Sequence, residues 1–172
     1  MKFNGYVVYT LFMAIFVSVI IGIPYFWDSF PKACETGFTV FKPTCHQLPE
    51  RSFFIFGHQM PVCSRCFGFY LGMLVAALLF PAFRKIDEKR IPHIVWLIAA
   101  CAPMGIDGGS QLAAQALNMP VLYWLHVFGL NESMNWIRFI TGLLAGGAIS
   151  FYAIPILNGL FENISNTWMK KK

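Results

Sequence analysis

The chain alternates between long apolar runs and short polar segments. Four runs contain no charged residue: residues 6–26, 66–83, 91–106 and 139–161. A helix needs about 20 residues to cross a bilayer core of about 30 Å, so the third run is long enough only if it continues past Asp107. The pattern therefore predicts an all-α polytopic membrane protein, a single domain over residues 1–172 with transmembrane helices at about 6–26, 66–83, 91–114 and 135–161.

Two of the segments between these helices are long. Residues 27–65 hold most of the cysteine and histidine and are predicted to form a polar loop. Residues 115–131 are apolar but interrupted by Gln115, Asn118, Pro120 and His126, which favours a re-entrant or interfacial segment over a fifth span. The first run is interpreted as a retained helix, because it is long for a signal peptide and no small-x-small site follows it before Lys32.

Composition supports a membrane protein. Hydrophobic residues make up 57% of the chain and charged residues only 12%, against roughly a quarter in soluble domains. The net charge of +5 does not indicate nucleic-acid binding, because the basic residues flank apolar runs instead of forming a stripe among aromatics. The expected partner is the lipid bilayer, and the sequence predicts no oligomeric state.

The distribution of Lys and Arg predicts the orientation. Four spans put both termini on one side, and cytoplasmic termini place eight of the 13 basic residues inside and five outside. The positive-inside rule favours this arrangement. We therefore expect a multi-pass protein of the cell membrane, with cytoplasmic termini and the Cys/His loop outside.

This orientation brings three polar segments to the outer side: the Cys/His loop, the stretch around Asp107, and NESMNWIR at residues 131–138. Asp107 and Gln111 are four residues apart and share a helix face. A charge at membrane depth costs about 2.5–3.5 kcal/mol on insertion scales and usually faces a cavity or a partner. We therefore expect the polar segments to meet in one pocket.

Two interpretations of that pocket stay open. The first is a structural ion pair of Asp107 or Glu132 with Arg138. The second is a substrate site, in which arginines hold an anionic group and an acid or base moves protons. In the second, the catalytic candidates are Asp107, Glu132 and His46, and the substrate-binding candidates are Arg51, Arg65, Arg138, Gln111, Asn135 and Ser52.

The cysteine spacing indicates a metal site. Cys63 and Cys66 form a CxxC, Cys45 lies 18 residues before it, and His58 lies five residues before it. Thiolate and imidazole ligands at such spacing suit tetrahedral Zn²⁺. Cys45, His58, Cys63 and Cys66 are therefore the predicted ligands. If water takes the fourth position instead, the bound water can ionise near neutral pH and the site becomes hydrolytic.

Two other interpretations of the cysteines remain. Cys63 at a helix N-terminus beside Arg65 would have a lowered pKa, which suits redox chemistry. This arrangement resembles the quinone-linked disulfide-forming membrane proteins, with Cys34 and Cys45 as a second pair. Alternatively, Cys63–Cys66 or Cys34–Cys45 disulfides would only staple an outer loop. Cys101 is interpreted as a small core residue.

Glycines predict which helices touch. Gly68 and Gly72 form one GxxxG pair in the second predicted span, and Gly142 and Gly146 form another in the fourth. Such pairs allow close approach of helix backbones in membranes. We therefore expect these two helices to pack tightly.

Four motifs together resemble a known family. CHQLPERSF, GHQMPVCSRCFGFYLG, IDGGSQ and ESMNWIRFITGLLAGG are similar to the small predicted membrane proteins catalogued as domain of unknown function 2085. The resemblance runs from about Cys45 to Gly146 and implies no particular reaction. Cys34 lies outside the pattern, which weakens a relay that needs a second cysteine pair, and residues 117–130 look longer than the usual connection.

The function favoured by these patterns is a membrane enzyme with an outer Cys/His zinc site, acting on an anionic, lipid-like substrate such as a lipid phosphate. A membrane thiol–disulfide oxidoreductase that uses the CxxC with a quinone is the first alternative. A small transporter or binding protein with a structural metal is the second.

Overall fold

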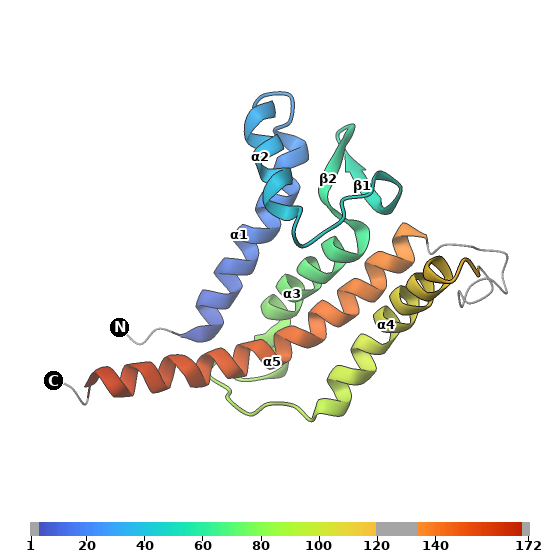
Figure 1. Ribbon diagram of the computed structural model, residues 1–172. Helices are drawn as coiled ribbons and strands as arrows, with labels where there is room; N and C mark the ends of the chain where they lie inside the picture. Colours follow the sequence, from blue (N-terminus) through green and yellow to red (C-terminus); the bar gives the residue numbers. More distant parts are fainter. Residues whose placement is uncertain (1–3, 120–133, 170–172) are drawn as a thin grey trace.

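The structure is a computed structural model that describes residues 4–119 and 134–169. The described residues are mostly helical, with five α-helices, one 3₁₀ turn and one two-stranded hairpin (Figure 1). In chain order the elements are α1 (Gly5–Tyr25), α2 (Pro31–Phe41), η1 (Pro49–Arg51), β1 (Ser52–Ile55), β2 (His58–Cys63), α3 (Ser64–Phe83), α4 (Ile94–Ala116) and α5 (Asn135–Met169).

Three of the described helices, α1, α3 and α5, are long and apolar enough to cross a membrane. The sequence predicts a fourth span at 91–114, where α4 lies. This helix has 23 residues, so its length is sufficient. It is not among the three candidates, and its C-terminal half contains the polar stretch DGGSQ.

The three candidate spans pack along one another, with α3 in contact with both α1 and α5 (Figure 1). Helices α1 and α3 run antiparallel, since Tyr6 stacks on Phe80 at 6.1 Å between ring centroids and Phe16 meets Tyr70 at 4.8 Å. Helices α3 and α5 run parallel. The start of α1 and the end of α5 therefore lie at one end of the bundle, and the starts of α3 and α5 lie at the other.

The tightest contact joins α3 to α5 through the two predicted glycine pairs. A Cβ added at Gly68 or Gly72 would overlap the carbonyl oxygens of Phe139 and Leu143, and one added at Gly146 would overlap the carbonyl oxygen of Phe69. Only a hydrogen atom fits at these positions, so the two backbones are in direct contact. The predicted packing of these helices is confirmed.

Helix α4 lies against α5 and turns its polar side inward. Its buried residues are Asp107, Gln111 and Ala114. Its large apolar side chains are exposed, among them Ile94, Trp96, Ile98, Ile106 and Leu112. A helix in water buries its apolar stripe, so the reverse arrangement of α4 suits surroundings of lipid.

Residues 27–65, expected as a loop, contain α2, η1 and the β1–β2 hairpin above the starts of α3 and α5 (Figure 1). Helix α2 begins with Pro31, a residue favoured in the first helical turn. The hairpin turns at Phe56 and Gly57, both with positive φ, as a two-residue type I′ connection requires. Met60 and Val62 of β2 are fully buried against α1 and α2.

The expected interfacial segment at 115–131 falls mainly on residues 120–133, which lie outside the described residues. Its first two residues, 115 and 116, complete α4. Glu132 also lies outside the described part of the chain.

The glycine contact generates a stability prediction. Gly146→Ala forces a methyl group against the Phe69 carbonyl and should destabilise the fold by about 1–3 kcal/mol. Gly159→Ala in the same helix is the control, because a Cβ there meets nothing within 4 Å, and it should be neutral or stabilise by up to about 1 kcal/mol. Thermal unfolding of both variants in detergent measures the difference. Equal unfolding temperatures would contradict the direct backbone contact.

Candidate metal centre and buried polar cluster

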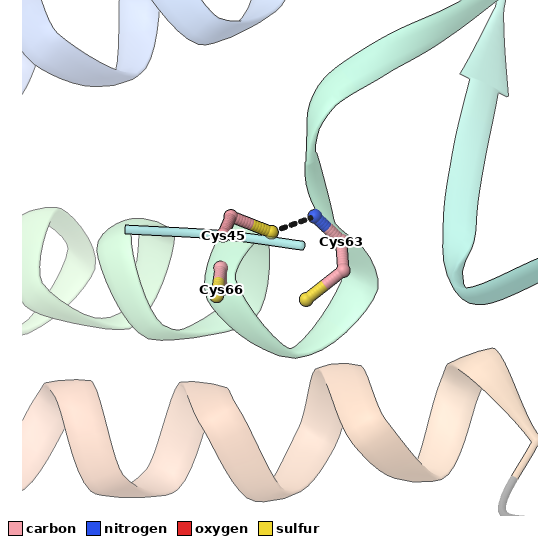
Figure 2. Close-up of side chains that lie close together, drawn as sticks. All are labelled: Cys45, Cys63 and Cys66. Carbon is pink, nitrogen blue, oxygen red and sulfur yellow. Dashed lines mark hydrogen bonds between the residues drawn. The ribbon is translucent and has the colours of Figure 1, made fainter. Parts of the chain in front are cut away.

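Three cysteines converge beneath the hairpin. The Sγ atoms of Cys45, Cys63 and Cys66 all lie within 4.8 Å of one another. Cys45 follows α2, Cys63 ends β2 and is the N-cap of α3, and Cys66 lies in the first turn of α3 (Figure 2). Residues from two distant parts of the chain therefore form one thiol cluster.

Hydrogen bonds made by Cys45 itself and by Gln47, two residues later, hold Cys45 in position. Its backbone N–H donates to the Phe41 carbonyl at 3.0 Å, closing the end of α2. Gln47 adopts a left-handed conformation with φ 53°. Its side-chain amide donates to the carbonyls of Phe38, at 2.8 Å, and Pro61, at 2.7 Å. These bonds tie the Cys45 segment to both α2 and β2, so Cys45 is held beside the CxxC.

The cluster favours a thiolate at Cys63. Hydrogen bonds from the Cys45 and Cys66 thiols, together with the backbone N–H groups of Cys66 and Arg65, lower the pKa of Cys63 to about 2. The pKa of Cys45 is raised, mainly because its thiol interacts with Cys63. The Cys63 backbone N–H also donates to the Cys45 sulfur at 3.1 Å (Figure 2). These bonds thus favour a thiolate at Cys63 over one at Cys45.

This donor set fits a thiophilic cation. Zinc binds thiolates at about 2.3 Å, which separates sulfurs by about 3.8 Å in a tetrahedral site. The three Sγ atoms, within 4.8 Å of one another, need little movement to reach that spacing. Cys45 is buried and the other two are partly buried, so the site is partly open to water.

His58, expected as the fourth ligand, lies elsewhere. Its Nε2 is 3.1 Å from Asp28 Oδ1, and its ring stacks on Trp27 at 5.6 Å. His58 and Cys63 are the two ends of β2. Five residues of extended strand separate them by about 17 Å and point them to opposite faces. The described residues thus provide three ligands together, and the structure does not bring His58 to them.

The remaining residues of the cysteine predictions are also separated from this cluster. His46 is exposed and is not part of the thiol group. Cys34 is buried and its thiol donates to the Ile23 carbonyl at 3.3 Å. All five cysteines, Cys101 included, are free thiols, so neither of the expected disulfide staples is present.

A buried ion pair lies on the other side of the same turn. Arg65 Nη2 donates to Asp107 Oδ2 at 2.5 Å, joining α3 to α4. The Asp107 side chain is 0% exposed and that of Arg65 is 26% exposed. The expected partner of Asp107 in a structural pair was Arg138, whereas the pair seen here uses Arg65. Removing one member of such a pair leaves an uncompensated buried charge.

A polar network joins α3, α5 and the hairpin. Ser64 Oγ lies within hydrogen-bond distance of the Arg51 carbonyl, at 3.0 Å, and of Asn135 Oδ1, at 3.2 Å. The Asn135 amide donates to the Ser52 carbonyl at 3.4 Å, and Arg138 Nη1 donates to Asn135 Oδ1 at 3.2 Å. Ser52 and Asn135, expected to bind substrate, therefore have structural hydrogen bonds. Arg138 is buried beside them.

The structure thus brings most predicted residues to one end of the bundle but divides them between two centres. Cys63 and Cys66 belong to the thiol cluster, while Ser64 and Arg65, the residues between them, face the polar side. Gln47 lies in the family motif CHQLPERSF but was not among the predicted site residues, and neither was Gln59, whose side-chain amide donates to the Gln47 carbonyl at 2.7 Å. Its place directly after Cys45 and His46 could have indicated from the sequence that Gln47 supports the site.

Comparison with known proteins identifies relatives of this chain. The family model described as "Predicted membrane protein (DUF2085)" matches residues 45–152, more than half of the chain. An uncharacterized protein of Methanocaldococcus jannaschii is 41% identical over 147 residues, which cover 86% of this chain and 83% of that protein.

An uncharacterized protein of Methanothermobacter thermautotrophicus is 37% identical over 106 residues, covering 62% of this chain and 80% of that protein. No solved structure matches the chain. The matched range contains all three clustered cysteines and both members of the Arg65–Asp107 pair. The chain belongs to the family of predicted membrane proteins catalogued as domain of unknown function 2085.

Proposed function

We propose that this protein is a zinc-binding membrane protein, in which Cys45, Cys63 and Cys66 hold one Zn²⁺ at the membrane surface. The observation that carries the proposal is the convergence of three sulfurs within 4.8 Å. Neither a CxxC redox pair nor a simple staple needs the third thiol. The bonds of Gln47 to α2 and β2 hold Cys45 at that position.

Three protein ligands leave a fourth position for water or substrate, as in catalytic zinc sites. Zinc bound there would supply a Lewis acid or a hydroxide at neutral pH. The neighbouring polar residues of α3, α4 and α5 would bind the anionic part of a lipid-like substrate, and their described charged members include Arg65, Asp107 and Arg138. An enzyme would need both the zinc site and the anion-binding residues. A binding or transport protein with a structural metal would need zinc only to hold the structure together.

An apolar groove supports an amphiphilic substrate. A groove of about 640 Å³ lies between α1 and α2, lined by residues that include Ala14, Val19, Phe30 and Cys34. Cys34 also belongs to the apolar cluster that includes Cys45. In a bilayer this groove would face lipid, and it has the volume of a small-molecule site. A hydrocarbon chain there would run close to the proposed zinc centre.

The direction of the helices supports four membrane crossings. Helices α3 and α5 are both candidate spans and run parallel, so the chain between them must return across the bilayer. Helix α4 runs back alongside α5 (Figure 1), and 23 residues of helix extend about 35 Å. In this proposal the positive-inside rule places the termini in the cytoplasm and the thiol cluster outside.

Metal analysis tests the proposal. Protein purified without chelators should contain about one zinc per chain, and Cys45→Ser should lose most of it, because one of three thiolates is removed. Cys101→Ser is the matched control, since Cys101 is outside the cluster, and it should keep the zinc of the wild type. Elemental analysis of folded, monodisperse protein measures both. Zinc-free protein that stays folded, or equal zinc in the Cys45 and Cys101 variants, would rule out the site.

A second candidate function, thiol–disulfide exchange, is favoured by the low pKa of Cys63. In that reaction the Cys63 thiolate and the Cys66 thiol form a disulfide and release two electrons and one proton; a quinone takes up the two electrons, this proton and a second proton from water to become a quinol. The raised pKa of Cys45 would leave it protonated and uninvolved. Loss of the two free thiols on addition of quinone, without loss of metal, would favour this function over zinc binding.

The thiolate itself gives a pH prediction. A thiol reacts with iodoacetamide only when deprotonated, so an ordinary cysteine reacts about a hundredfold more slowly at pH 5 than at pH 7. The pKa of Cys63 is lowered to about 2, so its alkylation rate in metal-free protein should be nearly constant over that range. Mass spectrometry of the alkylated peptide measures the rate, with glutathione as reference. A hundredfold fall at Cys63 would contradict the clustered thiolate.

A further inference from the structure

The buried face of α4 contains a side-chain donor, on Gln111, that makes no hydrogen bond within the described residues. Gln111 is only 4% exposed. Its side-chain Nε2 is buried and has no hydrogen-bond partner within residues 4–119 and 134–169. Buried donors without an acceptor are rare in native structures, because burial removes their bonds to water and returns nothing. The amide therefore marks a position where an acceptor is missing.

A second unused donor lies on the helix that faces this position. Arg65 Nε is also buried without a hydrogen-bond partner in the same described ranges. The Arg65 guanidinium contacts the turn of α4 just before Gln111. Its Nη2 binds Asp107, and its Nη1 is 3.1 Å from the position that a Cβ at Gly108 would take. Residues four apart share a helix face. Arg65 thus reaches from α3 to the buried face of α4, and Gln111 lies on that face one turn beyond Asp107.

The neighbouring polar groups do not satisfy these donors. The Ser110 hydroxyl donates to the Asp107 backbone carbonyl at 3.3 Å. The Asn135 side-chain amide donates to the backbone carbonyls of Glu50 and Ser52. The Ser52 hydroxyl donates to the Leu48 carbonyl. An acceptor for Gln111 and Arg65 would then have to be supplied from outside these groups. The glycine at 108 leaves room beside the guanidinium, since a larger side chain there would press on it.

We propose that Gln111 and Arg65 form an oxyanion site, which takes the oxygens of a phosphate group. Both unused groups are N–H donors, so the partner that they lack is a hydrogen-bond acceptor. Acceptors that are ionised make the strongest bonds to guanidinium and amide N–H. The phosphate is either that of a lipid headgroup or a soluble one. This inference rests on the anionic-substrate part of the proposed function and does not depend on zinc.

Binding by full-length protein in detergent and in nanodiscs tests the site. Inorganic phosphate is titrated against protein in neutral detergent, and phosphatidic acid is titrated into nanodiscs of zwitterionic lipid, with the unfolding temperature as readout. One of the two should raise the unfolding temperature of the wild type with saturation. Stabilisation by inorganic phosphate identifies a soluble ligand, and stabilisation by phosphatidic acid alone identifies a headgroup. No stabilisation by either overturns the proposal.

Gln111→Leu separates recognition from folding. It removes the unused donor, so without ligand the variant should unfold at or above the wild-type temperature, while its apparent affinity for the phosphate probe should fall about tenfold or more. Gln115→Leu, the same change one turn on at an exposed position, should keep wild-type affinity. Gln111→Glu, which replaces the donor by an acceptor, should weaken binding further and serves if the leucine variant does not fold.

Zinc content, measured on the same samples, keeps the two proposals apart. Wild type and the Gln111 variants should carry equal zinc, because the thiol cluster is unchanged. Phosphate binding by protein that contains no zinc would rule out only the metal centre. If zinc is present but the Gln111 variants bind phosphate as tightly as the wild type, only the oxyanion site is ruled out. The same conclusion follows if Gln111→Leu unfolds at a lower temperature than the wild type and still binds phosphate normally.

Discussion

The direct contact between the backbones of α3 and α5 is the constraint on which the other features depend. Gly68, Gly72, Gly142 and Gly146 remove the side chains that would hold these helices apart. Because the two helices run parallel, their first turns lie next to each other. Ser64 and Arg65 at the start of α3 therefore lie beside Asn135 and Arg138 at the start of α5. The hairpin, which leads into α3, is positioned by the same contact.

This arrangement explains how a small membrane protein can contain several buried charges. Lipid cannot solvate a guanidinium or a carboxylate, and the protein surrounds these groups with its own polar atoms. Asp107 is fully buried with Arg65 bound to it, and Arg138 is buried beside Asn135. Helix α4 completes the enclosure by turning its polar face inward and its apolar residues outward.

Much of this organisation could be predicted from residue spacing, because the spacing of two residues within a helix determines whether their side chains lie on the same face. The GxxxG pairs predicted the α3–α5 contact, and the four-residue interval from Asp107 to Gln111 predicted their shared buried face. His58 shows the limit of such reasoning. Its distance from the CxxC in sequence suits a metal site only if the chain turns back, whereas residues 58–63 form an extended strand. Pro61 within that run argues against a strand from sequence alone.

The short CSRC segment has a further consequence. Its two sulfurs belong to the thiol cluster, and the two residues between them belong to the polar cluster, so one helical turn serves both centres. A small rotation of that turn on filling one centre would shift groups in the other. Any such coupling is reciprocal by thermodynamic linkage: whatever one occupant does to the affinity for the second, the second does to the first. If both proposed sites are occupied, the first turn of α3 would therefore link the affinity of one ligand to the binding of the other.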